Sequence, residues 1–210
     1  MKGFWQCFIF TIIIFSSGCC CSDIFHQRVY DPKALEKPYQ EGINKKEIIS
    51  LKAGNNLFAL TPLATYEVTA KIVGKKKYSW GWKADVSPYD LALAWGELAR
   101  PENEEYVKYF QLFRWYYYFY GKDCPFSKAY ISSHSANTHI IPANFIVLKG
   151  LKRLRTKDCA TFYGFLVRLD SNVNGYPVWW KSSLTRHDSG DGACELFYVT
   201  KIIYNGEIYQ

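Results

Sequence analysis

The chain has 210 residues, of which 49% are hydrophobic, 21% are charged and 18% are aromatic. This length supports one well-buried domain but not comfortably two, and aromatic residues are enriched in strands rather than in helix bundles. The net charge of +7 favours weak attraction to anionic lipids or polyanions but identifies no partner. We therefore expect one mostly β domain.

An uncharged, largely apolar stretch from Gly3 to Ser22 follows Lys2. A basic start, a short hydrophobic run and a small-residue region are the layout of a secretory signal peptide. The run is short for a membrane span, which needs about 20 apolar residues. We expect residues 1–18 to be a cleaved signal peptide, with an uncleaved signal anchor as the alternative.

The residues before Cys19 are small, and the sequence Phe15–Cys19 resembles the lipobox of bacterial lipoproteins. The resemblance implies that Cys19 becomes an acylated N-terminus, and acyl chains such as palmitate anchor a protein through their buried methylene groups. With either a lipid anchor or a signal anchor, the domain would be tethered to a membrane of the bacterial cell envelope.

A polar segment with both signs of charge runs from Asp23 to Asn56 and contains two prolines and two glycines. This composition predicts that residues 19–56 form a lipidated N-terminus and a tether, and that the domain spans 57–210. The alternative for part of the segment is a stretch that packs along the flank of the domain.

Several segments show a strand or helix pattern. Thr65–Val73 alternates apolar and polar residues like a half-buried strand, and a basic turn is expected at Gly74–Lys77. Ser87 and Pro88 have the pattern of a helix start, so a short helix is expected before Arg100.

The stretch from Tyr109 to Tyr120 is the most aromatic in the chain, with nine aromatic residues among twelve. We expect one strand here, either buried on both faces or leaving one face, with Trp115, as a stacking platform. Apolar residues from Val147 to Leu154 recur at helical spacing and predict a short amphipathic helix. The remaining strands are expected at Thr161–Leu169, Pro177–Leu184 and Cys194–Tyr204.

These elements predict an α+β fold that is mostly antiparallel β, a single sheet-rich or small barrel-like domain with one or two short helices. Cys124, Cys159 and Cys194 lie in this domain. An exported protein can pair two of them, and their spacing does not decide which.

The polar side chains that are candidates for catalysis or binding gather in two segments. The first, Ser133–Ala143, carries His134, Asn137 and His139. The second, Ser182–Glu195, is a long Asp/Gly-rich loop. It contains Arg186, His187, Asp188, Cys194 and Glu195.

A thiol, an imidazole and an orienting group are the parts of a nucleophilic site, with Cys194 as nucleophile, His139 or His134 as base, and Asn137 or Asp188 as orienter. The alternative is that these groups form buried structural hydrogen bonds, since a cysteine at a strand start is commonly a small buried hydrophobe. Arg186, His187, Glu195 and Trp115 are candidate binding residues. The spacing of the acidic and histidine residues matches neither an EF-hand nor a helical zinc pair, so no metal site and no cofactor are expected.

Four motifs in one order are similar to a family of small bacterial proteins of unknown function. They are Asp85–Gly96, Ser135–Ala143, Ser182–Arg186 and Gly192–Glu195, and the likeness covers about residues 57–199. The resemblance implies a bacterial origin and a single domain, and it carries no activity.

Two functions remain open from the sequence. The first is an envelope lipoprotein whose domain binds an envelope protein or a small ligand without turning it over. The alternative is a tethered Cys/His hydrolase or transferase. Nucleic acid is not expected as a partner, because an exported protein rarely meets it.

Overall fold

The fold is built almost entirely from strands. A computed structural model describes residues 30–44, 47–186, 190 and 192–210, and the signal peptide and Cys19 lie outside them. The strands are β1 (Tyr39–Gly42), β2 (Ile49–Ala53), β3 (Asn56–Lys77), β4 (Tyr89–Ala94), β5 (Val107–Leu112), β6 (Trp115–Tyr120), β7 (Ser135–Pro142), β8 (Cys159–Val173), β9 (Tyr176–Lys181), β10 (Glu195–Tyr204) and β11 (Glu207–Tyr209).

Short helices connect or flank these strands. The α-helices are α1 (Trp82–Val86), α2 (Lys128–Ser133) and α3 (Phe145–Arg153), and the 3-10 helices are η1 (Pro32–Leu35), η2 (Gly96–Ala99) and η3 (Pro101–Asn103). Three α-helices are one more than expected. None of the helices in the described part of the chain is both long and apolar enough to cross a bilayer.

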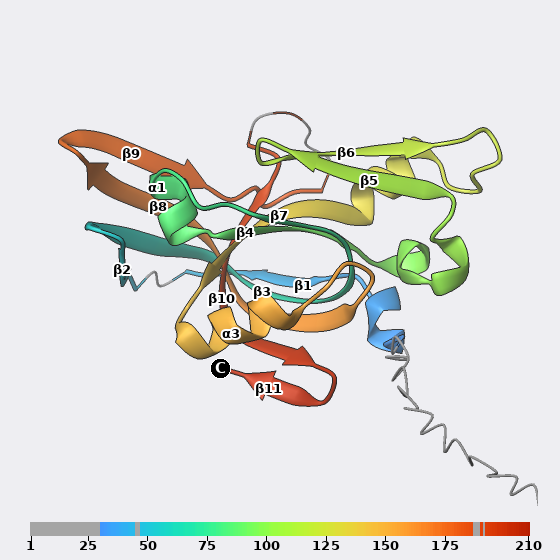
Figure 1. Cartoon of the computed structure of the whole chain (residues 1–210), viewed down its shortest axis with the longest axis horizontal. Coiled ribbons are helices and arrows are strands. Elements are labelled where there is room, and N and C mark those ends of the chain that lie inside the picture. The colour runs from blue at the N-terminus through green and yellow to red at the C-terminus, as the bar shows by residue number, and fades with distance from the viewer. Residues whose placement is uncertain (1–29, 45–46, 187–189, 191) are drawn as a thin grey trace, which may run out of the picture.

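Five strands close into a small barrel. β3 pairs with β4, β4 with β7, β7 with β10, and β10 with β8, and β8 pairs back with β3. Every pairing in this circuit is antiparallel except that of β7 with β10. Figure 1 shows the strands of the circuit curving around a common interior. The expected mostly antiparallel, barrel-like domain is confirmed.

The alternating pattern of β3 fills the barrel. Val68, Ala70 and Ile72 are buried in one core cluster with Phe162 of β8 and Phe197 of β10. Side chains alternate between the faces of a strand, so every second residue of β3 points to the interior. Full burial of each large apolar side chain stabilises the fold by about 1.5–3 kcal/mol. The strands predicted around Thr65–Val73 and in β8, β9 and β10 are confirmed.

The predicted helix after Ser87 is wrong, because residues Tyr89–Ala94 form β4. Every residue of β4 is buried. A strand that is covered on both faces loses the apolar and polar alternation, so its short apolar run resembles a helix segment. Only the end of the predicted helix is helical, as the single 3-10 turn η2.

The aromatic stretch is a hairpin rather than one strand. β5 and β6 pair with each other, and Phe113 and Arg114 form the two-residue turn with φ of 49° and 66°. Positive φ at both positions is the signature of a type I′ turn, which ordinarily prefers Asn-Gly. The Phe-Arg pair gives no such signal, so the turn could not be recognised from the sequence.

The predicted basic turn at Gly74–Lys77 is also wrong, because β3 continues to Lys77. Its pairing with β4 shifts register next to Gly74. The Lys75 ammonium donates to the backbone carbonyls of Leu151, Lys152 and Leu154 at 2.6–3.2 Å. A cation at this end of α3 satisfies carbonyls that have no partner within the helix. Lys75 therefore secures α3 against the barrel.

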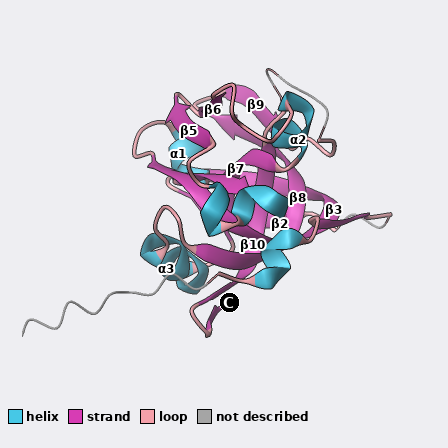
Figure 2. Ribbon diagram, turned by 90° about the vertical axis from the view of Figure 1, so that its right-hand side faces the viewer, coloured by secondary structure: helices cyan, strands magenta, loops and turns pink. Residues whose placement is uncertain are grey.

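The amphipathic helix expected around Val147–Leu154 is confirmed as α3. The Asn144 side chain caps its start by accepting from the backbone N–H of Val147 at 3.0 Å. Val147 and Leu151 are fully buried against the barrel core. Figure 2 shows α3 outside the strands, next to β10.

Part of the segment expected to be a tether belongs to the sheet. β1 pairs with residues 64–67 of β3, and β2 pairs with residues 56–60. In the described part of this segment, the chain therefore runs along the flank of the domain, which is the alternative that the sequence left open.

Candidate functional site

The polar residues of interest gather on the outer face of three neighbouring barrel strands. Asp90 of β4 is in register with His139 of β7, and His139 is in register with Leu196 of β10. Asn137 lies two residues before His139 and therefore on the same face. Since Thr138 pairs with Glu195, Asn137 comes level with Cys194, immediately before β10 begins.

The β5–β6 hairpin covers this outer face. Figures 1 and 2 both show it as a separate layer beside β7. Gln111 of β5 donates to the Asn137 side-chain oxygen at 2.8 Å, and Tyr116 of β6 contacts Ser135. These contacts explain why polar residues outside the barrel are nonetheless buried.

Asp90 lies at the centre of the buried polar network. Its side chain is fully buried, and its Oδ1 lies 2.9 Å from Nη1 of Arg114 and 2.9 Å from Nδ1 of His139. The Arg114 contact is a hydrogen-bonded ion pair. Although His139 Nδ1 and Asp90 Oδ1 lie 2.9 Å apart, the two atoms are not hydrogen-bonded. A buried carboxylate needs such neighbours because its desolvation is costly.

Aromatic rings pack against both His139 and Arg114 of this network. The His139 imidazole packs against Trp180 with ring centroids 4.5 Å apart. The Arg114 guanidinium lies 4.1 Å above the ring centre of Tyr78 and also donates to the Ser87 carbonyl. Burial lowers the pKa of Arg114, while the charge of Asp90 opposes that shift. The network therefore has a fixed geometry.

Cys194 is held by an amide. The side-chain N–H of Asn137 lies 3.6 Å from the Cys194 sulfur and also donates to the Arg114 carbonyl at 2.9 Å. Since Gln111 binds the other end of the amide, the orientation of Asn137 is determined by its partners.

Cys194 and His139 face the same cavity. It has a volume of about 140 Å³. The residues on its walls are Lys83, Phe113, Arg114, Trp115, His139, Trp180, Lys181, Gly190, Gly192 and Cys194. Across the parallel pairing of β7 with β10, Cys194 is level with Asn137, two residues before His139 on the same face.

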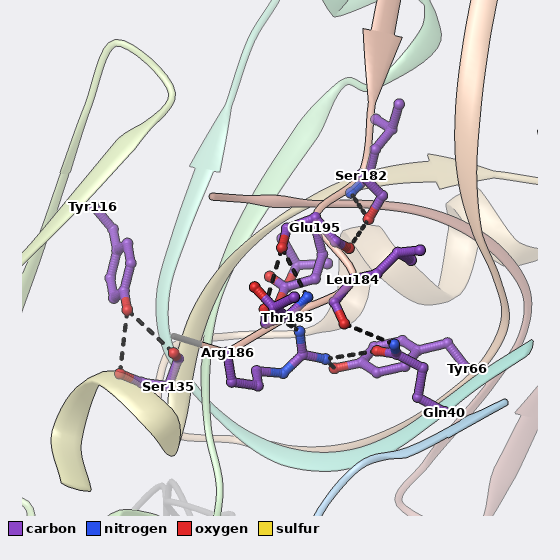
Figure 3. Close-up of polar contacts among 12 residues, drawn as sticks. Gln40, Tyr66, Tyr116, Ser135, Ser182, Leu184, Thr185, Arg186 and Glu195 are labelled. Carbon is purple, nitrogen blue, oxygen red and sulfur yellow. Dashed lines mark hydrogen bonds and ion pairs between the residues drawn. The ribbon is translucent and has the colours of Figure 1, made fainter. Parts of the chain in front are cut away.

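A second cavity of about 170 Å³ adjoins the other side of Cys194 and contains Arg186 and Glu195 on its walls. Arg186 forms a 2.7 Å ion pair with Glu195 and donates to the Tyr66 hydroxyl at 2.9 Å. Burial raises the pKa of Tyr66, and the positive charge of Arg186 partly offsets this effect. Figure 3 shows these residues close to Gln40, with Tyr116 and Ser135 nearby.

The structure brings together Asn137, His139 and Cys194, and it places Arg186, Glu195 and Trp115 on the walls of the adjoining cavities. Predicted residues His187 and Asp188 lie outside the described residues, as does Cys19. These residues of the expected cluster therefore lie around two cavities that share Cys194.

His134 belongs elsewhere. Its ring stacks on Tyr130 at 3.9 Å, and its Nδ1 lies 3.0 Å from the Tyr130 carbonyl. The Ser133 hydroxyl also lies 3.0 Å from this nitrogen. His134 borders a different cavity, with Trp95 and Leu184 on its walls. Of the two candidate histidines, the geometry favours His139 as the partner of Cys194.

Sequence reasoning missed Asp90, Arg114 and Trp180. Asp90 falls within the helix expected after Ser87, and Arg114 falls within the single strand expected from Tyr109 to Tyr120. One signal in the sequence could have identified Asp90, because it is the single carboxylate inside the apolar run Tyr89–Ala94. A charge in such a run is expected to be buried, and a buried charge requires a partner.

The other described thiols have different surroundings. Cys159 is a free thiol in β8, and burial raises its pKa to about 11. A thiol with such a pKa is a poor nucleophile at neutral pH. Among the residues with described positions, no three His, Cys, Asp or Glu side chains converge as metal ligands.

Comparison of the chain with protein families, with curated proteins and with solved structures finds no match.

Proposed function

We propose that the domain is a thiol-dependent acyl hydrolase or acyltransferase in which Cys194 is the nucleophile and His139 the general base. The observation that carries this proposal is that both side chains face one cavity, with Asp90 2.9 Å behind His139. Nucleophile, base and orienting carboxylate are the three roles that such chemistry requires.

The reaction balances with these groups. His139 accepts the Cys194 proton as the sulfur attacks the acyl carbon and forms the C–S bond. The tetrahedral intermediate then collapses, and the leaving group departs with the proton from the imidazolium. Water or an acceptor then attacks the thioester carbon while His139 takes its proton. The C–S bond breaks, and the imidazolium returns that proton to the sulfur, which regenerates the thiol. Asp90 stabilises the imidazolium each time it forms.

Positive charge near the sulfur supports the proposal. Arg114 and Lys83 stand on the walls of the cavity that Cys194 faces. Cations close to a thiol favour its ionised form, which is the reactive one. The Asn137 amide, already 3.6 Å from the sulfur, is suited to donate to an oxygen that becomes negative during attack.

The cavities limit the size of the reacting group. Their volumes of about 140 and 170 Å³ are below the roughly 300–1,000 Å³ of ordinary ligand pockets. We propose that a small acyl group enters and that the remainder of the substrate stays outside.

Covalent trapping tests this proposal. The purified protein is treated with p-nitrophenyl acetate, and the acyl adduct is located by peptide mass spectrometry. We expect acetylation of Cys194 in the wild type and in His134→Gln. The acetylation should be strongly slowed in His139→Gln and lost in Cys194→Ala. Equal acetylation of all cysteines, or none on the folded protein, would argue against it.

A second candidate is binding of a small ligand or an envelope protein without turnover. It is favoured by the polar groups of Tyr116, Ser135 and Asn137 on the walls of the larger cavity. In this case Cys194→Ala would leave the function intact, whereas Asn137→Ala would weaken it.

We also propose that the domain is a lipoprotein of the bacterial envelope, anchored through an acylated Cys19. The supporting observation is the N-terminal sequence: an apolar run, then small residues, then a thiol. Mass spectrometry of the N-terminal peptide tests this, since an intact leader or an unmodified Cys19 on cytosolic protein would exclude it.

A further inference from the structure

The outward face of the β5–β6 hairpin is apolar and open to solvent. The register pairs Phe110 with Tyr117 and Leu112 with Trp115. These residues and Phe119 are all exposed, with exposed fractions from 39% to 63%. The opposite face of the hairpin packs on the barrel through Tyr109, Gln111, Tyr116 and Tyr118. Single exposed apolar residues are ordinary, but a contiguous set marks an interaction surface.

The tip of the hairpin extends this surface. The side chain of Arg114 is turned inward to Asp90, and its neighbour Phe113 is 81% exposed. The Tyr78 hydroxyl accepts from the Arg114 backbone N–H, and Trp80, two residues further, is 93% exposed. Positive φ at Phe113 is unfavourable for a bulky residue. The backbone at Phe113 is therefore strained, and its aromatic ring is exposed to solvent.

Lysines accompany these aromatic residues. Lys108 lies opposite Phe119 on the same face of the hairpin, and it is exposed. Lys76 and Lys77 are exposed just before Tyr78, and Lys83 is exposed in α1. The surface therefore combines apolar rings with positive charge, which is complementary to anionic lipid headgroups.

We infer that this hairpin face, the tip residue Phe113 and Trp80 dock on an anionic lipid surface. Tryptophan and tyrosine are favoured at the membrane–water interface because their rings are apolar and their polar atoms stay hydrated. The inference rests on the membrane tether proposed above. The 12 residues from Cys19 to Tyr30 span at most about 40 Å, so a tethered domain stays close to the bilayer and a weakly binding face is sufficient.

Docking would bring the candidate site to the lipid surface. Phe113 and Trp115 belong both to the docking face and to the walls of the cavity that contains His139 and Cys194. The substrate class that fits this arrangement is an acyl compound presented at the membrane.

Lipid photocrosslinking tests the inference on the full chain. Protein purified from membranes is reconstituted in nanodiscs of phosphatidylcholine with 30% phosphatidylglycerol and a diazirine-bearing lipid, and adducts are mapped by peptide mass spectrometry. Adducts should concentrate on peptides covering residues 78–83 and 108–119. They should fall at least fivefold in Phe113→Asn/Phe119→Thr, and also in the wild type when phosphatidylglycerol is omitted.

Tyr176→Thr is the matched control. Tyr176 is 74% exposed and follows a two-residue turn, Asn174–Gly175, with positive φ at both positions. Its substitution should leave the adduct pattern unchanged. Asn is well suited to the left-handed conformation at position 113, so the thermal midpoint of the double variant should stay close to that of the wild type.

Other outcomes overturn the inference or separate it from the proposed tether. Adducts spread evenly over the surface, or crosslinks between two copies of the hairpin, would exclude lipid as the occupant. If Cys19 is acylated but the hairpin peptides carry no adducts, the docking inference is rejected and the proposed lipid anchor is supported. If Cys19 is unmodified but added vesicles still label the hairpin, the docking inference is supported and the proposed lipid anchor is rejected.

Discussion

Arg114 at the tip of the β5–β6 hairpin and Asp90 in the barrel wall form a 2.9 Å ion pair that is largely shielded from solvent. The pair connects the hairpin to the strand that also positions His139. Breaking a buried pair by removing one partner typically costs about 3–5 kcal/mol, because the remaining charge is buried without compensation.

We expect Arg114→Met to lower the free energy of unfolding by about 3 kcal/mol and Asp90→Asn by a similar amount. The double variant should lose clearly less than the sum of the two losses, since both substitutions disrupt one interaction. Urea denaturation measures all three values. Strict additivity would show that the pair is not coupled.

Lys75 should stabilise the fold through α3. Lys75→Met removes a cation from three carbonyls at the helix C-terminus and should cost about 1–2 kcal/mol. The exposed neighbour Lys76 serves as the control, and Lys76→Met should change stability by less than about 0.5 kcal/mol. Equal effects at both positions would contradict the assigned role.

Glu104 should make stability depend on pH in the acidic range. Burial acts to raise the pKa of Glu104, but hydrogen bonds and charges from Lys157 and Lys71 outweigh it and hold the pKa below its ordinary value. A depressed folded pKa contributes stability above the unfolded pKa, and this contribution is lost as pH falls through the folded value. Part of the stability should therefore disappear over the acidic interval in which the pH falls from the ordinary glutamate value of 4.5 through the lower folded value. Glu104→Gln should be less stable at pH 7 and should show a flatter dependence over that interval in urea melts.

Gly164 should be indispensable to the barrel. It is the residue of β8 that pairs with Tyr66 of β3 on one side and Val199 of β10 on the other. A Cβ at this position would lie 2.0 Å from the Tyr198 carbonyl oxygen, where only the backbone can move. Gly164→Ala should cost more than about 3 kcal/mol, whereas Gly42→Ala in the open edge strand β1 should be nearly neutral. Thermal unfolding compares the two, and similar midpoints would contradict the close packing.

The fold could be predicted from the sequence for those strands and helices that bury only one face. β3 and α3 can be predicted from the sequence because each has one apolar face and one polar face. Their apolar residues therefore recur with periods of 2 and 3.6 residues. β4 is covered on both sides and has no such period. The hairpin turn could not be predicted because Phe and Arg are not residue types that favour a two-residue turn. The Asp90 side chain that Arg114 contacts is also 24 residues away in the sequence.

The candidate site was predictable in part for a similar reason. Asn137, His139 and Cys194 stand in polar segments, which mark them as unusual. Asp90 is placed beside His139 by the antiparallel pairing of β4 with β7, and Cys194 is placed beside Asn137 by the parallel pairing of β7 with β10. No local pattern encodes that pairing, because β7 and β10 are separated by α3, β8, β9 and the loop that follows them.

Alkylation of individual cysteines in the folded protein tests the pairing of Cys194 with His139 most directly. Iodoacetamide labelling at pH 7, followed by peptide mass spectrometry, should modify Cys194 at least about tenfold faster than Cys159, whose raised pKa provides an internal reference. His139→Gln should reduce the rate at Cys194 and leave Cys159 unchanged. A Cys194 that resists labelling until the protein unfolds, or that reacts equally fast without His139, would contradict the proposed thiol–imidazole site.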